Sequence, residues 1–373
     1  MEHTRASIAL LTVVFIALII SEPLAQLVQD LRSGSRPAAL DIFSRAPTAE
    51  NLRSYEDALR EQSVVANKIR PALQYWRFTS MGDAGANGMV GREGWLFYKP
   101  GVQFLVEPWQ AEQGEDVADA LAAIESFRDQ LAQRSIALLV LVVPGKESVY
   151  PNLLAAGAQR PVNGHVTTFL ETLRDRGVHA MYLMPEGDEL SRNNLFLKQD
   201  THWTPAYAKE CAERVAAFVT EQGWTTTGTA QFKLKQIALK RHGDILRMAK
   251  SHYVLNAIPP EEIICEQVIE SDTGQPYHDD PDAPILVLGD SFLRIFERDE
   301  PGSAGFVSHF ARALGQPVSS LISDGGASTL VRQELRRKAE LLRGKKLVIW
   351  EFVDRDLRFG TDGWQDVPLG NSN

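Results

Sequence analysis

The amino-acid sequence predicts an α/β protein built on a parallel sheet that helices cover on both faces. Two observations carry this prediction. Five continuous apolar runs, rich in valine, isoleucine and leucine, lie between residues 136 and 352, and segments with helical apolar periodicity separate most of them. A strand with one exposed face would alternate apolar and polar residues, so continuous apolar strands indicate a sheet that is buried on both sides.

The apolar runs, in chain order, are "IALLVLVVP", "VHAMYLMP", "APILVLGDSF", "PVSSLIS" and "KKLVIWEF". Before the first run, residues 115–134 carry one apolar stripe of a helix. After the second run, a helix is expected from Pro205, with Thr204 as its N-cap, to Gln222. Residues 224–280 break the alternation, and we interpret them as an irregular insertion that carries one helix.

The charge balance argues against a nucleic-acid partner. The 373 residues include 48 acidic and 39 basic side chains, which gives a formal net charge of −9. Only short basic runs occur, whereas nucleic-acid binding requires a dense basic surface. The two cysteines exclude a disulfide framework. Cys211 falls at an apolar helical position, which favours a place in the core, although pairing with Cys265 stays open.

Residues 1–28 are expected to form a signal-anchor or transmembrane segment. The stretch 6–20, "ASIALLTVVFIALII", is apolar, and Arg5 precedes it. It is shorter than the roughly 20 residues of a typical span, so a cleaved signal peptide is the alternative, but a good cleavage pattern is missing. We therefore expect a membrane-anchor helix, a helical stalk or packing segment over residues 29–84, and a main domain over residues 85–373. This topology keeps Arg5 on the cytoplasmic side of the membrane and exports the main domain.

A serine stands where the third apolar run ends. Gly289-Asp290-Ser291 follows "ILVL", so Ser291 is expected at the carboxyl end of a central strand, where parallel sheets bind their ligands. Gly289 permits a sharp turn that exposes the hydroxyl group, and the N–H of Ser291 is available to a developing oxyanion. A plain strand-ending turn is the alternative, because these residue types are common in turns.

Asp200 and His202 lie on the loop that follows the second apolar run and enters the helix at Pro205. We expect this loop at the same edge of the sheet as Ser291. A serine hydroxyl needs a base to take its proton, and a carboxylate fixes the tautomer of the imidazole. Ser291, His202 and Asp200 supply these roles in that order. One alternative is that Asp200 and His202 only flank the start of a helix and have no chemical role. A metal site is another alternative, but it needs a third protein ligand, and none stands close by in the sequence. No metal is therefore expected.

In the SGNH hydrolases, a serine motif opens the three-layer domain and an Asp/His motif closes it. The motifs of this chain resemble that arrangement, except that the second half of the domain comes first in the sequence. The chain thus resembles a circularly permuted SGNH domain. Six segments are also similar, in order and approximate spacing, to motifs of the alginate O-acetyltransferase family of the AlgJ/AlgX type. They are "GREGWLFY", "VVPGKESVYP", "DTHWTPAYA", "VLGDSF", "DGGAST" and "WEFVDRDL". This similarity spans about residues 85 to 358.

The resemblance implies transfer of an acetyl group, through an acetyl-serine intermediate, to hydroxyls of alginate or another exported polysaccharide. It places Asp200, His202 and Ser291 on the triad of the family, and no cofactor is expected. Gly326 in "DGGAST" is a candidate for a second oxyanion donor beside the N–H of Ser291. Ordinary SGNH enzymes have Gly-x-Asn-Asp where this chain has residues 351–356, so the usual asparagine donor is unassigned.

Four further residues at this edge are candidates for substrate binding. Lys146, Tyr150 and Arg355 follow other strands and are expected to orient an acidic sugar, with a structural Lys146–Glu147 contact and a packed tyrosine as alternatives. Trp203, directly after the histidine, is a candidate sugar platform or a wedge that holds the loop.

The partners follow from the same resemblance. Acetyl-CoA is cytoplasmic, so an exported enzyme needs a relayed donor, and the resemblance implies a membrane-bound O-acyltransferase as the acetyl relay. Two other functions stay open. A carbohydrate acetylesterase would use the same triad with water as acceptor, and a non-catalytic polysaccharide-binding scaffold would serve the export machinery.

Overall fold

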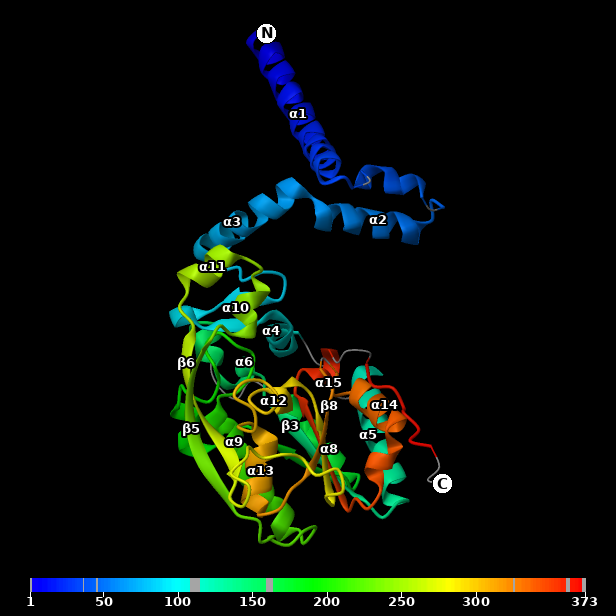
Figure 1. Ribbon diagram of the computed structural model, residues 1–373, viewed down its shortest axis with the longest axis vertical. Coiled ribbons are helices and arrows are strands. Elements are labelled where there is room, and N and C mark those ends of the chain that lie inside the picture. The colour runs from blue at the N-terminus through cyan, green and yellow to red at the C-terminus, as the bar shows by residue number, and fades with distance from the viewer. Residues whose placement is uncertain are drawn as a thin grey trace. The chain divides into compact units, whose positions relative to one another are not determined.

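The computed structural model of the chain describes residues 2–35, 37–44, 46–107, 115–158, 164–324, 326–359 and 363–370. The chain divides into two compact units (Figure 1). One comprises Met1–Asp83 and Lys250–Ala257, and the other comprises Ala84–Ala249 and Ile258–Asn373. The second unit therefore contains every residue that the sequence indicates for catalysis.

The first unit is helical. Its elements, the last of them from a much later part of the chain, are α1 (Glu2–Ser33), η1 (Ala38–Phe43), α2 (Ala49–Gln62), α3 (Val64–Met81) and α11 (His252–Ala257). The hydroxyl of Ser63 caps α3 by accepting a hydrogen bond from the N–H of Ala66. Ser251, just before α11, donates its hydroxyl to the carbonyl oxygen of Pro71 in α3 over 2.6 Å. This bond ties the late helix to the N-terminal ones.

Residues 2–28 of the predicted membrane-anchor segment, residues 1–28, fall within α1, and residue 1 lies outside the described residues. The apolar stretch 6–20 belongs to this helix, but polar residues flank it. Over the described part of the chain, none of the helices combines the length and the apolar character that crossing a membrane requires. The prediction of a membrane-spanning helix is therefore not supported.

The second unit is built on a sheet of five parallel strands, as the apolar runs predict. In spatial order they are β4 (His179–Tyr182), β3 (Ala137–Val143), β9 (Leu347–Val353), β7 (Ile285–Gly289) and β8 (Ser319–Ile322). Counted from β7 as the first strand, this order reads 5-4-3-1-2, which is the flavodoxin-like order of doubly wound sheets. From β7 the chain first adds β8 on one side and then continues with β9 on the other side. The neighbouring strands β7 and β9 therefore form the topological switch point of the sheet, where ligands bind in such folds.

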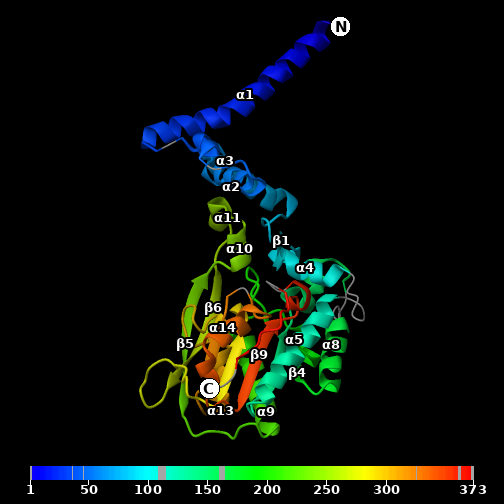
Figure 2. The same ribbon diagram turned by 90° about the vertical axis from the view of Figure 1, so that its right-hand side faces the viewer.

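Alternate residues of the central strands bury themselves on opposite faces of the sheet. Leu139, Leu141 and Val143 of β3 belong to one apolar core, and Leu138 and Val140 belong to the other. The first face is covered by helices α9 (Pro205–Glu221) and α13 (Phe306–Leu314). The second is covered by α5 (Glu115–Ala132), α8 (Gly164–Asp175) and α14 (Leu330–Arg337), of which α5 and α8 are seen at the right in Figure 2. The expected three-layer arrangement is thus present in the described residues.

The segment 224–280 is more regular than predicted. It contains a long antiparallel ribbon, β5 (Phe232–Arg241) paired with β6 (Glu261–Glu270), and the short helix α10 (Asp244–Met248). The strand β5 was missed because most of its side chains are at least partly exposed on both faces, so its sequence lacks a buried apolar period. The end of this ribbon proves important for the site.

The remaining elements of the second unit are short. They are β1 (Gly88–Val90), η2 (Arg92–Gly94), β2 (Leu96–Tyr98), α4 (Lys99–Val106), α6 (Lys146–Val149), α7 (Pro151–Leu154), η3 (Gly187–Ser191), α12 (Ser291–Arg294), η4 (Ala339–Leu342) and α15 (Asp356–Phe359). Cys211 in α9 and Cys265 in β6 are both buried and unpaired. Cys211 packs in the apolar core, as predicted, and burial raises the pKa of its thiol to about 11.

Candidate active site

Ser291 stands at the switch point of the sheet. It begins the short helix α12 two residues beyond β7, which lies between β9 and β8. Gly289, the last residue of β7, permits the close approach of Glu351, because a Cβ atom at this position would lie 2.3 Å from Oε2 of Glu351. The carboxylate of Asp290 then accepts a hydrogen bond from the N–H of Phe292 over 2.8 Å. These contacts direct the serine to the carboxyl edge of the sheet.

Asp200 and His202 lie at the tip of a narrow hairpin that precedes α9. Phe196 and Trp203 face each other in an antiparallel bridge, and the N–H of Leu197 donates to the carbonyl oxygen of His202 over 3.1 Å. The side chain of Thr204 accepts from the N–H of Tyr207 and caps α9, as the sequence predicts. The hairpin therefore presents Asp200 and His202 from a fixed base.

The structure brings the three predicted residues together. The Nε2 atom of His202 lies 2.8 Å from Oγ of Ser291, and its Nδ1 atom lies 2.6 Å from Oδ1 of Asp200. Asp200 is fully buried and His202 is 5% exposed, while Ser291 is half-buried. These are the distances of direct hydrogen bonds, so a proton on Ser291 has a continuous path to the imidazole.

Burial and charge set the protonation of this pair. Burial disfavours the ionised form of Asp200, but the hydrogen bond with His202 and the charge of Arg241 outweigh it and hold the pKa of Asp200 well below its usual range. Burial also acts to lower the pKa of His202, but the hydrogen bond and the charge of Asp200 outweigh it and raise that pKa. An ionised Asp200 only accepts hydrogen bonds, so Nδ1 carries the proton and Nε2 is free to accept from Ser291.

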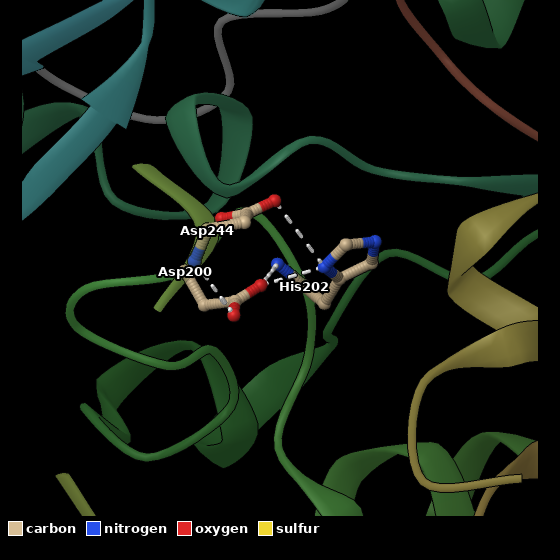
Figure 3. A group of neighbouring side chains, drawn as sticks. All are labelled: Asp200, His202 and Asp244. Atoms are coloured by element: carbon tan, nitrogen blue, oxygen red, sulfur yellow. Dashed lines mark hydrogen bonds and ion pairs between the residues drawn. The ribbon is translucent and has the colours of Figure 1, made fainter. Parts of the chain in front are cut away.

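Two charged residues that the sequence analysis did not single out also contact this group. Asp244 opens α10, and its backbone N–H donates to Oδ2 of Asp200 over 3.1 Å (Figure 3). Arg241, the last residue of β5, donates to the same oxygen over 3.4 Å. Both lie about forty positions from the hairpin in the segment interpreted as an irregular insertion, and no motif links them to the triad.

Asp200, His202 and Asp244 also offer one potential metal-ligand atom each within 4.8 Å of one another. The same atoms already have hydrogen-bond partners. Nδ1 of His202 faces Asp200, and both oxygens of Asp244 accept from Thr201. We therefore interpret the group as a hydrogen-bonded cluster.

Comparison with known proteins shows the family of this chain. The family model described as "SGNH hydrolase-like domain, acetyltransferase AlgX" matches residues 89–354, which is more than half of the chain and includes the whole triad. The chain belongs to the AlgX family of SGNH hydrolase-like acetyltransferase domains. The family resemblance inferred from the sequence motifs is thereby confirmed.

Relatives of this AlgX-family chain are named for acetyl transfer. The probable alginate O-acetylase AlgJ of Azotobacter vinelandii is 24% identical over 301 residues, which cover 76% of this chain and 73% of that protein. The corresponding protein of Pseudomonas putida is 27% identical over 310 residues, which cover 74% and 72%. The solved O-acetyltransferase domain of Pseudomonas putida AlgJ superposes with a TM-score of 0.60 at 24% identity and covers 74% of this chain and 94% of that domain. At this identity the structural likeness shows a shared fold.

Lys146 occupies a different place in the AlgX-family domain from the one expected. Its side chain is fully buried, and its ammonium group donates to the carbonyl oxygens of Leu197, Lys198 and Asp200 over 3.0, 3.3 and 2.6 Å. Burial lowers its pKa to about 8, against the charges of nearby carboxylates. Lys146 therefore holds the backbone of the triad hairpin, residues 196–203, and its buried side chain presents no surface to solvent.

Tyr150 and Trp203 are likewise fully buried. The hydroxyl of Tyr150 accepts from the N–H of Leu195 and donates to the carbonyl oxygen of Arg192, just ahead of the hairpin. The indole N–H of Trp203 donates to the carbonyl oxygen of Phe292 over 3.1 Å and so joins the hairpin to α12. Neither ring offers a face to a sugar, so the alternatives of a packed tyrosine and a wedge fit the structure.

Arg355 and Gly326 keep their proposed places near the edge of the sheet. Arg355 follows β9, is half-buried, and lies with its guanidinium 5.0 Å from the ring centre of Tyr98. Gly326 follows β8 and accepts a hydrogen bond at its carbonyl oxygen from Val331. The roles of Arg355 in substrate binding and of Gly326 as an oxyanion donor stay predictions.

Proposed function

We propose that this AlgX-family protein moves an acetyl group to the hydroxyls of an exported polysaccharide, alginate or another exopolysaccharide, through an acetyl-serine intermediate on Ser291. The observation that carries the proposal is the unbroken series of contacts from Ser291 through His202 to Asp200, with separations of 2.8 and 2.6 Å. The names of the AlgJ relatives support a polysaccharide as the acceptor.

The first half of the reaction loads the serine. Nε2 of His202 takes the hydroxyl proton as Oγ of Ser291 attacks the acetyl carbonyl carbon, and Asp200 stabilises the imidazolium that forms. The tetrahedral oxyanion accepts a hydrogen bond from the N–H of Ser291 and, in this proposal, from that of Gly326. The imidazolium then returns the proton to the leaving group of the donor, and the acetyl ester remains on Ser291.

The second half transfers the acetyl group. A sugar hydroxyl attacks the carbonyl carbon of acetyl-Ser291 while Nε2 of His202 takes its proton. The bond from carbon to Oγ breaks, and Oγ recovers the proton from the imidazolium. Loss of one oxyanion donor is expected to slow the reaction by about 10² to 10³.

The cellular setting belongs to the same proposal. An exported acceptor places the reaction on the periplasmic face of the bacterial inner membrane, and a membrane-bound O-acyltransferase would relay the acetyl group there. The exposed apolar side chains of α1, among them Leu11, Phe15 and Ile16, support contact with a lipid surface. Cell fractionation with the full-length chain tests this setting, and recovery in the cytoplasmic fraction would refute it.

The acceptor is tested with the purified full-length protein and an activated acetyl ester, with and without an oligosaccharide. We expect acetylated oligosaccharide with the wild type and at least about a 10³-fold loss with Ser291→Ala. Ser54→Ala, on an exposed position of α2, is the matched control and should keep full activity. Free acetate as the sole product would favour the esterase, and transfer that survives in Ser291→Ala would refute the proposed chemistry.

A further inference from the structure

Asp244 contacts the triad hairpin through three of its polar groups. Its N–H donates to Oδ2 of Asp200 over 3.1 Å. Its Oδ1 accepts from the N–H of Thr201 over 2.7 Å, and its Oδ2 accepts from the hydroxyl of Thr201 over 2.6 Å. One carboxylate from another element thus satisfies both donors of the residue that stands between Asp200 and His202.

The same carboxylate faces the imidazole. Oδ2 of Asp244 lies 3.7 Å from Nδ1 of His202, and Oγ1 of Thr201 lies 3.1 Å from that nitrogen. Figure 3 shows the carboxylates of Asp200 and Asp244 both directed at this one ring atom. Asp200 makes the direct bond, and Asp244 places a second carboxylate beside it. Burial and the charge of Asp200 raise the pKa of Asp244, and its charge in turn favours the protonated imidazole.

The backbone around Asp244 is shaped for this approach. A Cβ atom at Gly243 would lie 2.1 Å from the carbonyl oxygen of Gln199, so only glycine lets the chain pass this close to the hairpin. Arg241 then places its guanidinium beside Asp200 and over the ring of Phe296. Residues 241–244 therefore meet the triad as one unit, at the point where β5 ends.

We infer that Asp244 is a positioning residue of the triad. Through Thr201 it holds the hairpin tip that carries Asp200 and His202, and its charge stabilises the imidazolium that forms when His202 takes the serine proton. This inference rests on the proposed function, since an imidazolium forms only if His202 acts as the base.

A second carboxylate has a distinctive effect on pH dependence. The carboxylates acting on the imidazole come from three elements: Asp200 from the hairpin, Asp244 from α10 and Asp290 from the start of α12, while Arg241 faces Asp200. Each of these negative charges favours the protonated imidazole. His202 serves as a base only when neutral, so loss of the charge on Asp244 should extend activity to lower pH and reduce the rate at the plateau.

The test compares Asp244→Asn with the wild type in the full-length protein, using kcat/KM for cleavage of an activated acetyl ester between pH 4.5 and about 9. We expect the acidic limb of the kcat/KM profile, where His202 becomes protonated, to move to lower pH by about 0.5 to 1 unit. The plateau value of kcat/KM should fall roughly tenfold, with little change in KM. Asp272→Asn is the matched control. It removes an exposed carboxylate just beyond the opposite end of the β5–β6 ribbon and should leave both quantities unchanged.

A second readout is independent of turnover. In Ser291→Ala protein, the titration of the His202 ring, followed by NMR and assigned with His202→Gln, should show a lower midpoint when Asp244→Asn is added. Thr201→Val should also reduce the plateau rate, and Thr201→Ser should restore it, because serine keeps the hydroxyl that Asp244 binds.

The outcomes separate the two proposals. If the wild type lacks activity that depends on Ser291, the proposed function fails, while the ring titration still tests the link between Asp244 and His202. If the wild type is active and both the acid limb and the ring titration of Asp244→Asn match it, the inference is wrong, even if the variant is slower.

Discussion

Lys146 places a single cation among three carbonyl oxygens of the triad hairpin. In the same hairpin, the carboxylate of Glu261 accepts from the N–H groups of Lys198 and Gln199 over 2.9 and 2.7 Å. Buried backbone groups need partners, and here two charged side chains supply them. The tip of the hairpin is therefore held by side-chain hydrogen bonds in place of regular secondary structure.

Replacement of Lys146 by methionine removes the donor to the buried carbonyl oxygens of Leu197 and Asp200, whereas that of Lys198 still accepts from the N–H of Leu96. We expect Lys146→Met to lower the free energy of unfolding by about 3 kcal/mol and to reduce kcat more than KM. Urea unfolding and steady-state kinetics with an activated acetyl ester measure the two effects. Exposed Lys233→Met in β5 is the control, and a Lys146→Met protein as active and as stable as this control would contradict the account.

The residues of the triad were predictable because each stands just after a strand or before a capped helix, at one edge of the sheet. The positions of Lys146, Tyr150 and Trp203 at that edge were also predictable, but their burial was not. Sequence spacing places a residue on an edge without showing whether its side chain points outward. Asp244 was not predicted, because its contact with Asp200 depends on where the β5–β6 ribbon ends, and the sequence of this ribbon contains no motif.

At the scale of elements, the site depends on how closely two of them approach. The triad hairpin meets the turn between β5 and α10 backbone to backbone, and Gly243 is the residue that permits it. A displacement of about 1 Å at a catalytic group is sufficient to reduce a rate by about 10². The fit of this turn is therefore part of the geometry that the proposed reaction requires.

Gly243→Ala tests this contact. The added Cβ would overlap the carbonyl oxygen of Gln199, so we expect the hairpin or α10 to shift and kcat/KM to fall by roughly 10². Gly164→Ala is the matched control, because it lies at the start of α8 with open space around its Cβ position. Equal activity of the two variants, measured with the acetyl ester, would show that the close approach is unimportant.

The central strands and α9 were predictable from continuous apolar runs and from the Thr204–Pro205 start. The ribbon β5–β6 was not, because Lys233, Lys235 and Lys240 give β5 the composition of an exposed loop. A strand that pairs with one neighbour and faces solvent carries little apolar signal. Arg241 and Asp244, which lie at and just beyond the end of β5, were not predicted for the same reason.

At the scale of the whole molecule, several carboxylates are buried near the ends of β7 and β9. The strands bring Asp290 and Glu351 together, and the N–H of Asp290 donates to Oε2 of Glu351 over 3.2 Å. Burial and the charge of Asp290 raise the pKa of Glu351 well above its usual value. Burial also raises the pKa of Asp354 to about 6 and that of Asp356 to about 7. The folded protein thus retains protons that the unfolded chain releases.

This retention predicts how stability changes with pH. The folded state binds more protons than the unfolded state between the ordinary pKa of a glutamate, about 4.3, and the raised value, so stability falls as pH rises through that window. Glu351→Gln cannot ionise and should lose less stability than the wild type between pH 5 and pH 8. Urea midpoints at the two values measure this, with exposed Glu340→Gln as the control. Parallel pH dependence in all three proteins would contradict the raised pKa of Glu351.

The most direct test of the proposed reaction is whether Ser291 becomes acetylated. Brief exposure of the full-length protein to an activated acetyl ester without acceptor, followed by acid quenching and peptide mass spectrometry, measures it. We expect the mass of one acetyl group on the peptide that contains Ser291, and its release when an oligosaccharide is added before quenching. An unmodified Ser291 while the ester is consumed, or an acetyl group carried on another residue, would contradict the account.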